Sequence, residues 1–262
     1  MKPLLDALHK LWLLLVFVPC VLLSTALAVI ASFVLRVLLG ERRAGALVAP
    51  VWSRTLTVLL PLRVVVGGRD NIDRTRAYVV VSNHESQLDI LALYGRLGLD
   101  LRWIVKQEIR NIPLLGWGCR IVGHVFVDRQ NRDAAIASIN QAVLRLEPGE
   151  GMLFFPEGTR SKEGALMPFK SGAFRTALML NMPILPVSIE GAWELMRPGQ
   201  LLPDFGTVHV KVHAAIETSD LDTTNEQVRE LMRQARSRIA AGIDELQAQP
   251  SMPQPQSKLH EN

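Results

Sequence analysis

Cysteine is scarce in this sequence. The 262 residues contain Cys20 and Cys119 and no CxxC pair, so a disulfide framework is excluded and a reducing compartment is the natural expectation. Cys119 is a poor candidate for a nucleophile, because residues 116–119 offer no nearby base in the sequence. A GxSxG elbow is also absent, which argues against a serine hydrolase.

The chain also lacks a strong excess of charge. It has 29 Lys and Arg against 25 Asp and Glu, a formal net charge of +4 and a pI near 9.3. This mildly basic balance does not indicate a nucleic-acid partner. The sequence shows no internal repeat, and its length suits one domain of about 200 residues with an appendage.

Charged residues are missing from the stretch between Leu11 and Leu35. A helix of this length is about 37 Å long, and the hydrocarbon core of a bilayer is about 30 Å thick. We therefore expect a membrane helix, which Pro19 could bend. A signal peptide is the alternative, because Lys2 and Lys10 precede the run and residues 26–28 resemble a cleavage site. The run continues past that site, beyond the usual h-region of about 7–15 residues, which favours a retained anchor.

Basic residues gather after this apolar run rather than before it. Lys2 and Lys10, with Asp6, precede the run, and it is followed by Arg36, Arg42, Arg43, Arg54 and Arg63. The positive-inside rule then predicts an inner (cytoplasmic) membrane protein whose large domain lies on the cytoplasmic face.

A second apolar stretch runs from Ala44 to Leu62 and is interrupted by Arg54 and Pro61. It could lie in the membrane interface as an amphipathic helix, or pair with the first stretch as a hairpin in one leaflet. The sequence leaves open a single span or a monotopic hairpin. We divide the chain into a membrane-anchoring helical segment (residues 1–61), a main domain (62–248) and a polar tail (249–262) that we expect to be disordered.

Short apolar runs alternate with helical patterns in the main domain. The runs that predict strands are residues 62–66, 77–81, 102–105, 125–127, 152–155, 184–189 and 208–212. Helices are predicted after Asp133, a candidate cap, and after Thr224, which begins a capping box. This alternation predicts an α/β fold with a largely parallel sheet flanked by helices.

Two details of these runs carry expectations of their own. Pro186 suggests that its strand is irregular or lies at an edge of the sheet. His209 and His213 alternate with valines, so we place them on the solvated polar face of a strand rather than in a zinc site. No metal site is expected.

The polar heptapeptide 83–89 follows the strand predicted at 77–81. Ligand sites in α/β sheets cluster at the carboxyl ends of strands. His84 there can act as a base, and Asp89 can fix its tautomer and stabilise the imidazolium. Read alone, the same residues could be a loop histidine and an ordinary carboxylate at a helix start.

A second polar turn, residues 155–160, follows the strand predicted at 152–155. Gly158 would let the backbone approach an anion closely, and Arg160 offers a planar fork suited to phosphate. Thr159 adds a hydroxyl. Lys106 and Arg129, also at strand ends, could add positive charge, and Lys170 is a fourth cation of less certain position. The alternative is a local Glu157–Arg160 salt bridge.

Four blocks in this order resemble the motifs of the glycerolipid acyltransferase family, in particular the bacterial 1-acylglycerol-3-phosphate acyltransferases. They are Asn-His-x4-Asp at 83–89, residues 123–129, residues 155–160 and residues 185–189. The resemblance spans about residues 62 to 191 and shows no departure at a motif position. The late acyltransferases of lipid A carry Glu where this chain has Asp89, which argues against that branch.

The resemblance implies that His84 is the general base and Asp89 its orienting partner. It also implies that Glu157, Gly158 and Arg160, with Arg129 and Lys106, hold the phosphate of an acceptor. The expected reaction is acyl transfer from acyl-CoA or acyl carrier protein to the 2-hydroxyl of a membrane lysophosphatidate, with no further cofactor. One alternative is a different acceptor, namely another lysophospholipid or a lyso-ornithine lipid. The other is a different activity, that of an acyl-CoA thioesterase.

Overall fold

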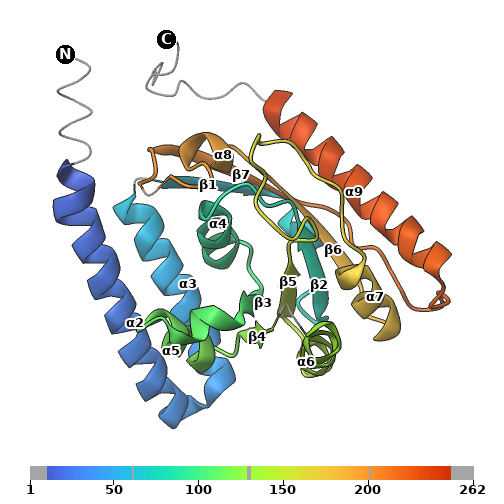
Figure 1. Cartoon of the computed structure of the whole chain (residues 1–262), viewed down its shortest axis with the longest axis horizontal. Helices are drawn as coiled ribbons and strands as arrows, with labels where there is room; N and C mark the ends of the chain where they lie inside the picture. Colours follow the sequence, from blue (N-terminus) through green and yellow to red (C-terminus); the bar gives the residue numbers. More distant parts are fainter. Residues whose placement is uncertain (1–10, 61, 129–130, 201, 249–262) are drawn as a thin grey trace.

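Seven strands form one sheet within the described residues of this computed structural model, which are 11–60, 62–128, 131–200 and 202–248 (Figure 1). The order along the sheet is β1-β7-β6-β2-β5-β3-β4, and all neighbours are parallel except β6 and β7. The strands are β1 Leu62–Gly67, β2 Tyr78–Ser82, β3 Asp100–Lys106, β4 Val125–Val127, β5 Glu150–Phe154, β6 Ile184–Glu190 and β7 Gly206–Val212. The largely parallel sheet is thus confirmed, and each apolar run corresponds to one strand.

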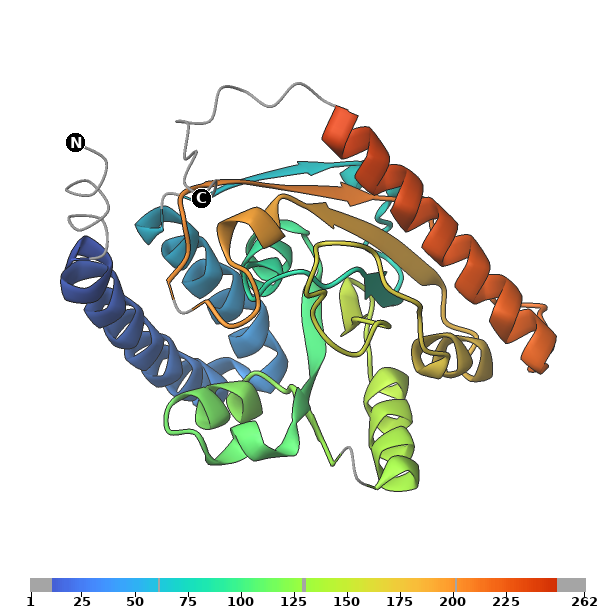
Figure 2. The ribbon, with the colours of Figure 1, turned by 45° about the horizontal axis from the view of Figure 1, so that its top comes forward.

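Helices cover both faces of the sheet (Figure 2). Their bounds are η1 Leu13–Phe17, α2 Val18–Leu39, α3 Glu41–Leu59, η2 Arg69–Asn71, α4 Leu88–Arg96, η3 Gln107–Asn111, α5 Leu115–Ile121, α6 Arg132–Leu144, α7 Gly172–Met179, α8 Ala192–Leu195 and α9 Asn225–Ala248. The N-cap of α6 is Asn131, whose side chain accepts from the Ala134 N–H, rather than the predicted Asp133. The predicted cap at Thr224 is confirmed, because its Oγ1 accepts from the Gln227 N–H.

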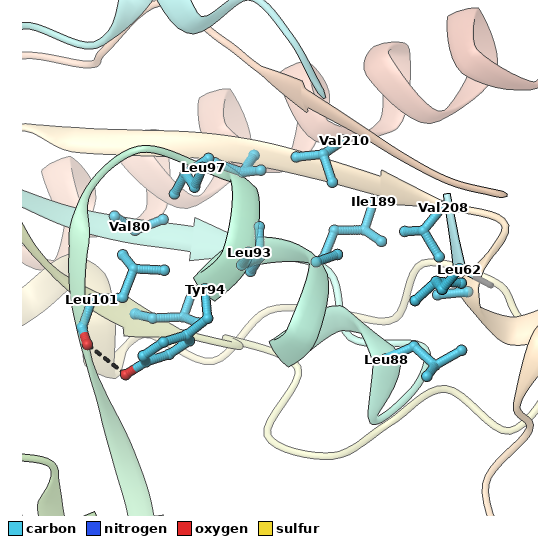
Figure 3. Packing of buried hydrophobic residues seen from close by; sticks show 14 of the residues in the cluster. Leu62, Val80, Leu88, Leu93, Tyr94, Leu97, Leu101, Ile189, Val208 and Val210 are labelled. Carbon is cyan, nitrogen blue, oxygen red and sulfur yellow. Dashed lines mark hydrogen bonds between the residues drawn. The ribbon is translucent and has the colours of Figure 1, made fainter. Parts of the chain in front are cut away.

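The side chains of β2 divide between two hydrophobic clusters, one on each face of the sheet. Val80 lies in the cluster under α4, whereas Val79 and Val81 lie in the cluster under α7 and α9. This follows from the two-residue period of a strand. Figure 3 shows the first cluster, where the Tyr94 hydroxyl donates to the Leu101 carbonyl. The β2 strand is therefore buried on both sides, which gives the loop after it a rigid base.

The two N-terminal helices lie side by side, with α3 between α2 and α4 (Figure 1). Leu13–Leu39 is long and apolar enough to cross a membrane; its most apolar window of 18 residues has a mean hydropathy of 2.8 and is mostly exposed. Such an exposed apolar surface is typical of a membrane-associated protein. A π-helical turn, η1, lies just before Pro19, where proline has no N–H for the regular ladder; the bend at Pro19 stays a prediction.

The second apolar stretch forms α3, which packs on the main domain through a buried stripe that includes Gly45 and Ser53. A methyl group at Gly45 would approach Val122 O to 3.2 Å, and Ser53 donates to the Leu91 carbonyl. One side of α3 is thus held by protein rather than by the membrane interface. The proposed division at residue 61 stays a prediction.

Of the two alternatives for the Pro186 strand, the edge position is wrong, because β6 lies inside the sheet between β7 and β2, and the irregular strand is confirmed. Val187 pairs with Val212, but Ile184 pairs with Ile216, so the register shifts by one residue at Pro186. The Pro186 carbonyl still accepts from the His213 N–H. Proline is tolerated in a sheet at such a bulge.

The expectation of a solvated polar face is also wrong for His213. Its Nε2 lies 2.7 Å from the Oγ of buried Ser188, which donates to the Ile239 carbonyl of α9. Burial lowers the pKa of His213 to about 4, so the ring is neutral near pH 7. Helix α9 covers this end of β7, which the two-residue period could not reveal.

Candidate active site

The predicted pair of His84 and Asp89 is formed at the carboxyl end of β2. His84 Nδ1 lies 2.8 Å from Asp89 Oδ2, and the Asp89 carboxyl is fully buried. Because Asp89 occupies Nδ1, Nε2 is the ring nitrogen that remains for a substrate proton. The sequence places the two residues five apart, so that the loop carries the imidazole and the first turn of α4 carries the carboxylate.

The same carboxylate oxygen also orders the loop. Asp89 Oδ2 accepts from the N–H groups of Glu85 and Ser86 at 2.8 and 2.9 Å. Asn83 is bonded in both directions to the backbone of Ile189 in β6, and Ser86 Oγ donates to the Met196 carbonyl. These bonds fix the loop against β6 and the chain after α8, so the ring of His84 is held before a substrate arrives.

Glu157 belongs to the second polar turn but acts on the first. Its Oε1 accepts from the His84 N–H at 2.7 Å, and its Oε2 accepts from the Met167 N–H at 2.9 Å. The side chain is buried and does not line the cavity described below. Burial raises its pKa, an effect that these two bonds oppose. The carboxylate thus contacts the backbone of His84, whereas the direct contact of Glu157 with phosphate stays a prediction.

Phe155 was not expected in the site. Its ring stacks on the His84 imidazole with centroids 3.8 Å apart and an interplanar angle of 13°. The stack restrains the ring while Asp89 holds its Nδ1 edge. The available signal was its place directly after β5, as the first residue of the polar turn.

A cavity of about 400 Å³ opens in front of His84. Its lining includes Lys106 at the end of β3 and, from the turn after β5, Gly158, Thr159 and Arg160. Since β2, β3 and β5 are parallel neighbours, their carboxyl ends meet at one edge of the sheet, as predicted. Within the described part of the chain, neither Lys106 nor Arg160 has a carboxylate partner, and the Glu157–Arg160 salt bridge, the alternative to a phosphate site, is not formed. Arg129 lies outside the described residues.

Lys170, the cation whose position the sequence left open, lies across Gly158. A methyl group at Gly158 would come within 2.5 Å of Lys170 Nζ. Gly158 also has a φ of +78°, a conformation that costs a side chain free energy. The positive φ favours glycine at this position, and the close approach of Lys170 brings a further cation to the rim of the turn.

Glu85 is a buried carboxyl next to the catalytic pair. Burial raises the pKa of Glu85 to about 9, and the nearby Asp89, Glu194 and Glu190 make smaller contributions in the same direction. Its Oε1 accepts from Asn83 Nδ2 at 2.9 Å. The Glu85 carboxyl is thus protonated at neutral pH.

A second cavity of about 110 Å³ lies between α2, α3, α4 and α5 and is almost entirely apolar. Ile90 and Trp103 line both cavities, so the two are neighbours. His124 of the second sequence block lines this apolar cavity; burial, with a smaller contribution from Arg102, lowers its pKa to about 3. His124 is therefore a neutral core residue. Cys119, also in this lining, has its pKa raised to about 11 by burial, which fits the expectation that it is no nucleophile.

Residues 63–190 match the family model described as Acyltransferase. An uncharacterized acyltransferase of Schizosaccharomyces pombe is 30% identical over 86% of this chain and 81% of its own length. The chain belongs to this acyltransferase family. The expected resemblance is thereby confirmed, and the family match extends from β1 through β6, the strands that carry the site.

Two further similar proteins have more specific names. The 1-acyl-sn-glycerol-3-phosphate acyltransferase LPAT1 of Arabidopsis thaliana chloroplasts is 31% identical over 78% of this chain, which spans 55% of that relative's length. The crystal structure of the 1-acyl-sn-glycerophosphate acyltransferase PlsC of Thermotoga maritima matches with a TM-score of 0.80 at 27% identity, over 96% of this chain and all of that one. The second match covers the N-terminal helices as well as the sheet.

Proposed function

We propose that this acyltransferase moves a fatty acyl group from acyl-CoA or acyl carrier protein to the 2-hydroxyl of 1-acylglycerol-3-phosphate, which gives phosphatidic acid. The observation that carries the proposal is the His84–Asp89 pair facing a cavity lined by two cations, Lys106 and Arg160, that have no carboxylate partner among the described residues. The names of the Arabidopsis and Thermotoga relatives support the same acceptor.

In the proposed mechanism, His84 Nε2 takes the proton of the acceptor hydroxyl as its oxygen attacks the thioester carbonyl. Asp89 stabilises the imidazolium that forms. General-base catalysis of this kind raises the reaction rate by about 10²–10⁴-fold. The tetrahedral intermediate then collapses, the carbon–sulfur bond breaks, and the imidazolium returns the proton to the leaving thiolate. A thiolate is a good leaving group, so the scheme needs neither a covalent acyl-enzyme nor a further cofactor.

The acceptor's phosphate fits the cation side of the cavity. Arg160 supplies a fork for two phosphate oxygens, and Lys106 supplies a point charge from the neighbouring strand. Gly158 and Thr159 complete that wall of the cavity, and we retain Arg129 as a further candidate from the sequence. The neighbouring apolar cavity supports a place for part of an acyl chain, because it is lined by the membrane-side helices α2 and α3.

We also propose that the protein acts at the inner membrane with its sheet domain on the cytoplasmic face. The exposed apolar surface of α2 and the arginines that follow it support this placement. Both the acceptor and the product partition into lipid, so a site beside the membrane helices reaches them without extracting them into water.

The test measures CoA release and radiolabelled product with membranes that carry the wild type or His84→Ala, across a panel of acceptors. Release that depends on lysophosphatidate and is lost in the variant supports both reaction and base. Activity with a different lysolipid alone would replace the substrate, and CoA release without any acceptor would indicate a thioesterase. Equal activity in the variant would overturn the role of His84.

A further inference from the structure

The segment 107–121, formed by η3 and α5, exposes large apolar side chains. Trp117 is 61% exposed, Ile112 47% and Leu115 38%. Contiguous apolar side chains of this size on a surface mark an interaction site more often than a chance feature. Helix α5 packs on α2, and a methyl group at Gly118 would contact Val29 at 3.4 Å. The patch is therefore continuous with the apolar surface of the candidate membrane helix.

A strained turn holds this segment in place. Leu114 has φ +64° and ψ −55°, and the Leu115 N–H donates to the Pro113 carbonyl across it at 2.7 Å. This is a γ-turn of the rare, strained hand, which costs of order 1–3 kcal/mol. Gly116 lies so close to the Arg110 carbonyl that a methyl group would approach it to 2.3 Å. The γ-turn and this close approach restrict the backbone that carries the exposed Trp117.

Basic residues flank the apolar patch. Lys106, Arg110 and Arg120 are exposed, whereas Glu108 is the one acidic residue in the range 106–121. Apolar and aromatic side chains bordered by Lys and Arg are typical of segments that lie in the headgroup layer of an anionic bilayer. Tryptophan in particular prefers that layer.

The segment also forms part of the active-site mouth. Lys106 and Ile109 line the cavity in front of His84, and Leu114 and Leu115 line the apolar cavity beside it. One rigid piece of chain thus joins the cation side of the site, the apolar cavity and the exposed patch. An element in the lipid headgroup layer at this place would hold the mouth at the level of a lysolipid's phosphate.

We propose that residues 107–121 are a second membrane-contact element, in addition to α2, with Trp117 inserted in the headgroup layer and Arg110 and Arg120 on anionic headgroups. Its role in presenting the acceptor rests on the proposed function. Its contact with lipid does not, and the two parts are tested separately.

The contact is tested by tryptophan fluorescence of the full chain in bilayers of phosphatidylcholine and phosphatidylglycerol with brominated acyl chains. The emission of Trp117 is the difference between the emission of the wild type and that of Trp117→Phe. Bromines near the headgroups should quench it more than bromines near the bilayer centre. Trp193→Phe is the matched control, since Trp193 packs against Gly164 and Arg197 away from α5. The emission of Trp193, obtained in the same way from Trp193→Phe, should be quenched little by bromines at either depth. Quenching of the Trp117 emission by aqueous iodide instead, or its shielding by self-association of the chain, would overturn the proposal.

The role in acceptor presentation is tested by kinetics. Trp117→Glu should raise the apparent KM for a long-chain acceptor in the same vesicles by about tenfold, from loss of one inserted aromatic side chain. The constants for a short-chain, water-soluble lysophosphatidate should not change. Met179→Glu, at an exposed apolar position of α7, should leave both unchanged, and Trp117→Phe should remain close to wild type.

Equal losses on both acceptors would overturn the presentation role and point to a folding or catalytic defect. If the wild type acylates no acceptor at all, the proposed function fails, while the fluorescence result still decides whether the segment contacts lipid.

Discussion

The two sides of the cavity in front of His84 are built differently. On the base side, Asn83, Ser86 and Asp89 are almost completely buried, and each bonds to backbone groups of the protein. On the cation side, Lys106 and Thr159 are exposed, and Lys106 and Arg160 have no carboxylate partner within the described residues. The groups that move a proton are thus held before binding, whereas the groups that meet the acceptor stay free to pair with it.

The difference follows from what each side must do. A general base needs a fixed distance and a fixed tautomer, which buried bonds supply. A phosphate site needs cations that do not already have partners, because a pre-formed ion pair would have to be broken. Changes on the base side should therefore lower kcat, and changes on the cation side should raise the KM for the acceptor.

The largest effect is expected from His84→Ala. Loss of the general base should lower kcat by about 10²–10⁴-fold, because no other group holds the position of Nε2. Turnover and circular dichroism in detergent check the prediction together. A correctly folded variant with wild-type turnover would remove the base side from the mechanism altogether.

Glu157→Gln sharpens the comparison, because Glu157 comes from the cation-side turn but holds the backbone of His84. A Gln side chain has one oxygen, so its NH₂ group would face either the His84 or the Met167 N–H. Loss of one charged hydrogen bond costs about 1.5–3 kcal/mol, and we expect kcat to fall by roughly 10–100-fold at an unchanged KM for the acceptor.

Exposed Glu163 of the same loop supplies the control for that variant, since Glu163→Gln should change neither constant. If Glu157→Gln instead raised the acceptor KM at a normal kcat, the phosphate contact expected from the family would be supported in place of the positioning role.

Arg160→Ala tests the cation side. Because one of the cations that line the cavity is removed, the apparent KM for lysophosphatidate should rise by about tenfold, with a smaller change in kcat. Arg160→Lys keeps the charge without the fork and should recover part of the loss. An acceptor without phosphate, such as a monoacylglycerol, should respond to neither variant. A change confined to the acyl-CoA KM would place Arg160 at the donor instead.

The strands and the catalytic pair could be predicted because their signals are local. A run such as residues 77–81 is buried on both faces of the sheet, so its composition alone marks it. His84 and Asp89 lie within one loop and the helix turn after it, and the distance between them is set by that loop. Lys106 and Arg160 were expected together because parallel strands end at the same edge of a sheet.

Other features depend on contacts between distant parts of the chain. The carboxylate of Glu157 could point to the cavity or to His84, and the sequence of its turn is the same in both cases. Pro186 is compatible with an edge strand or an irregular one, and only the one-residue shift in the pairing of β6 decides between them. His213 reads as solvated until α9 is placed over it. Each outcome is decided by packing between elements far apart in sequence.

Glu85→Gln has the smallest expected effect on turnover and tests how the base side is stabilised. The folded chain holds a proton on Glu85 up to about pH 9, whereas a free glutamate loses it near pH 4.5. The raised pKa means that this group's contribution to stability is complete below pH 4.5 and is lost as the pH rises toward 9, at up to about 1.4 kcal/mol per pH unit.

Gln keeps the acceptor for Asn83 and does not titrate. The variant should therefore match the wild type in thermal stability at pH 4.5 and exceed it increasingly up to pH 9, with normal kcat at neutral pH. Thermal unfolding midpoints of both proteins in detergent, measured across this range, check the prediction. A constant difference between the two midpoints would show that Glu85 titrates in the folded protein as a free carboxyl does, and that burial does not hold a proton on it.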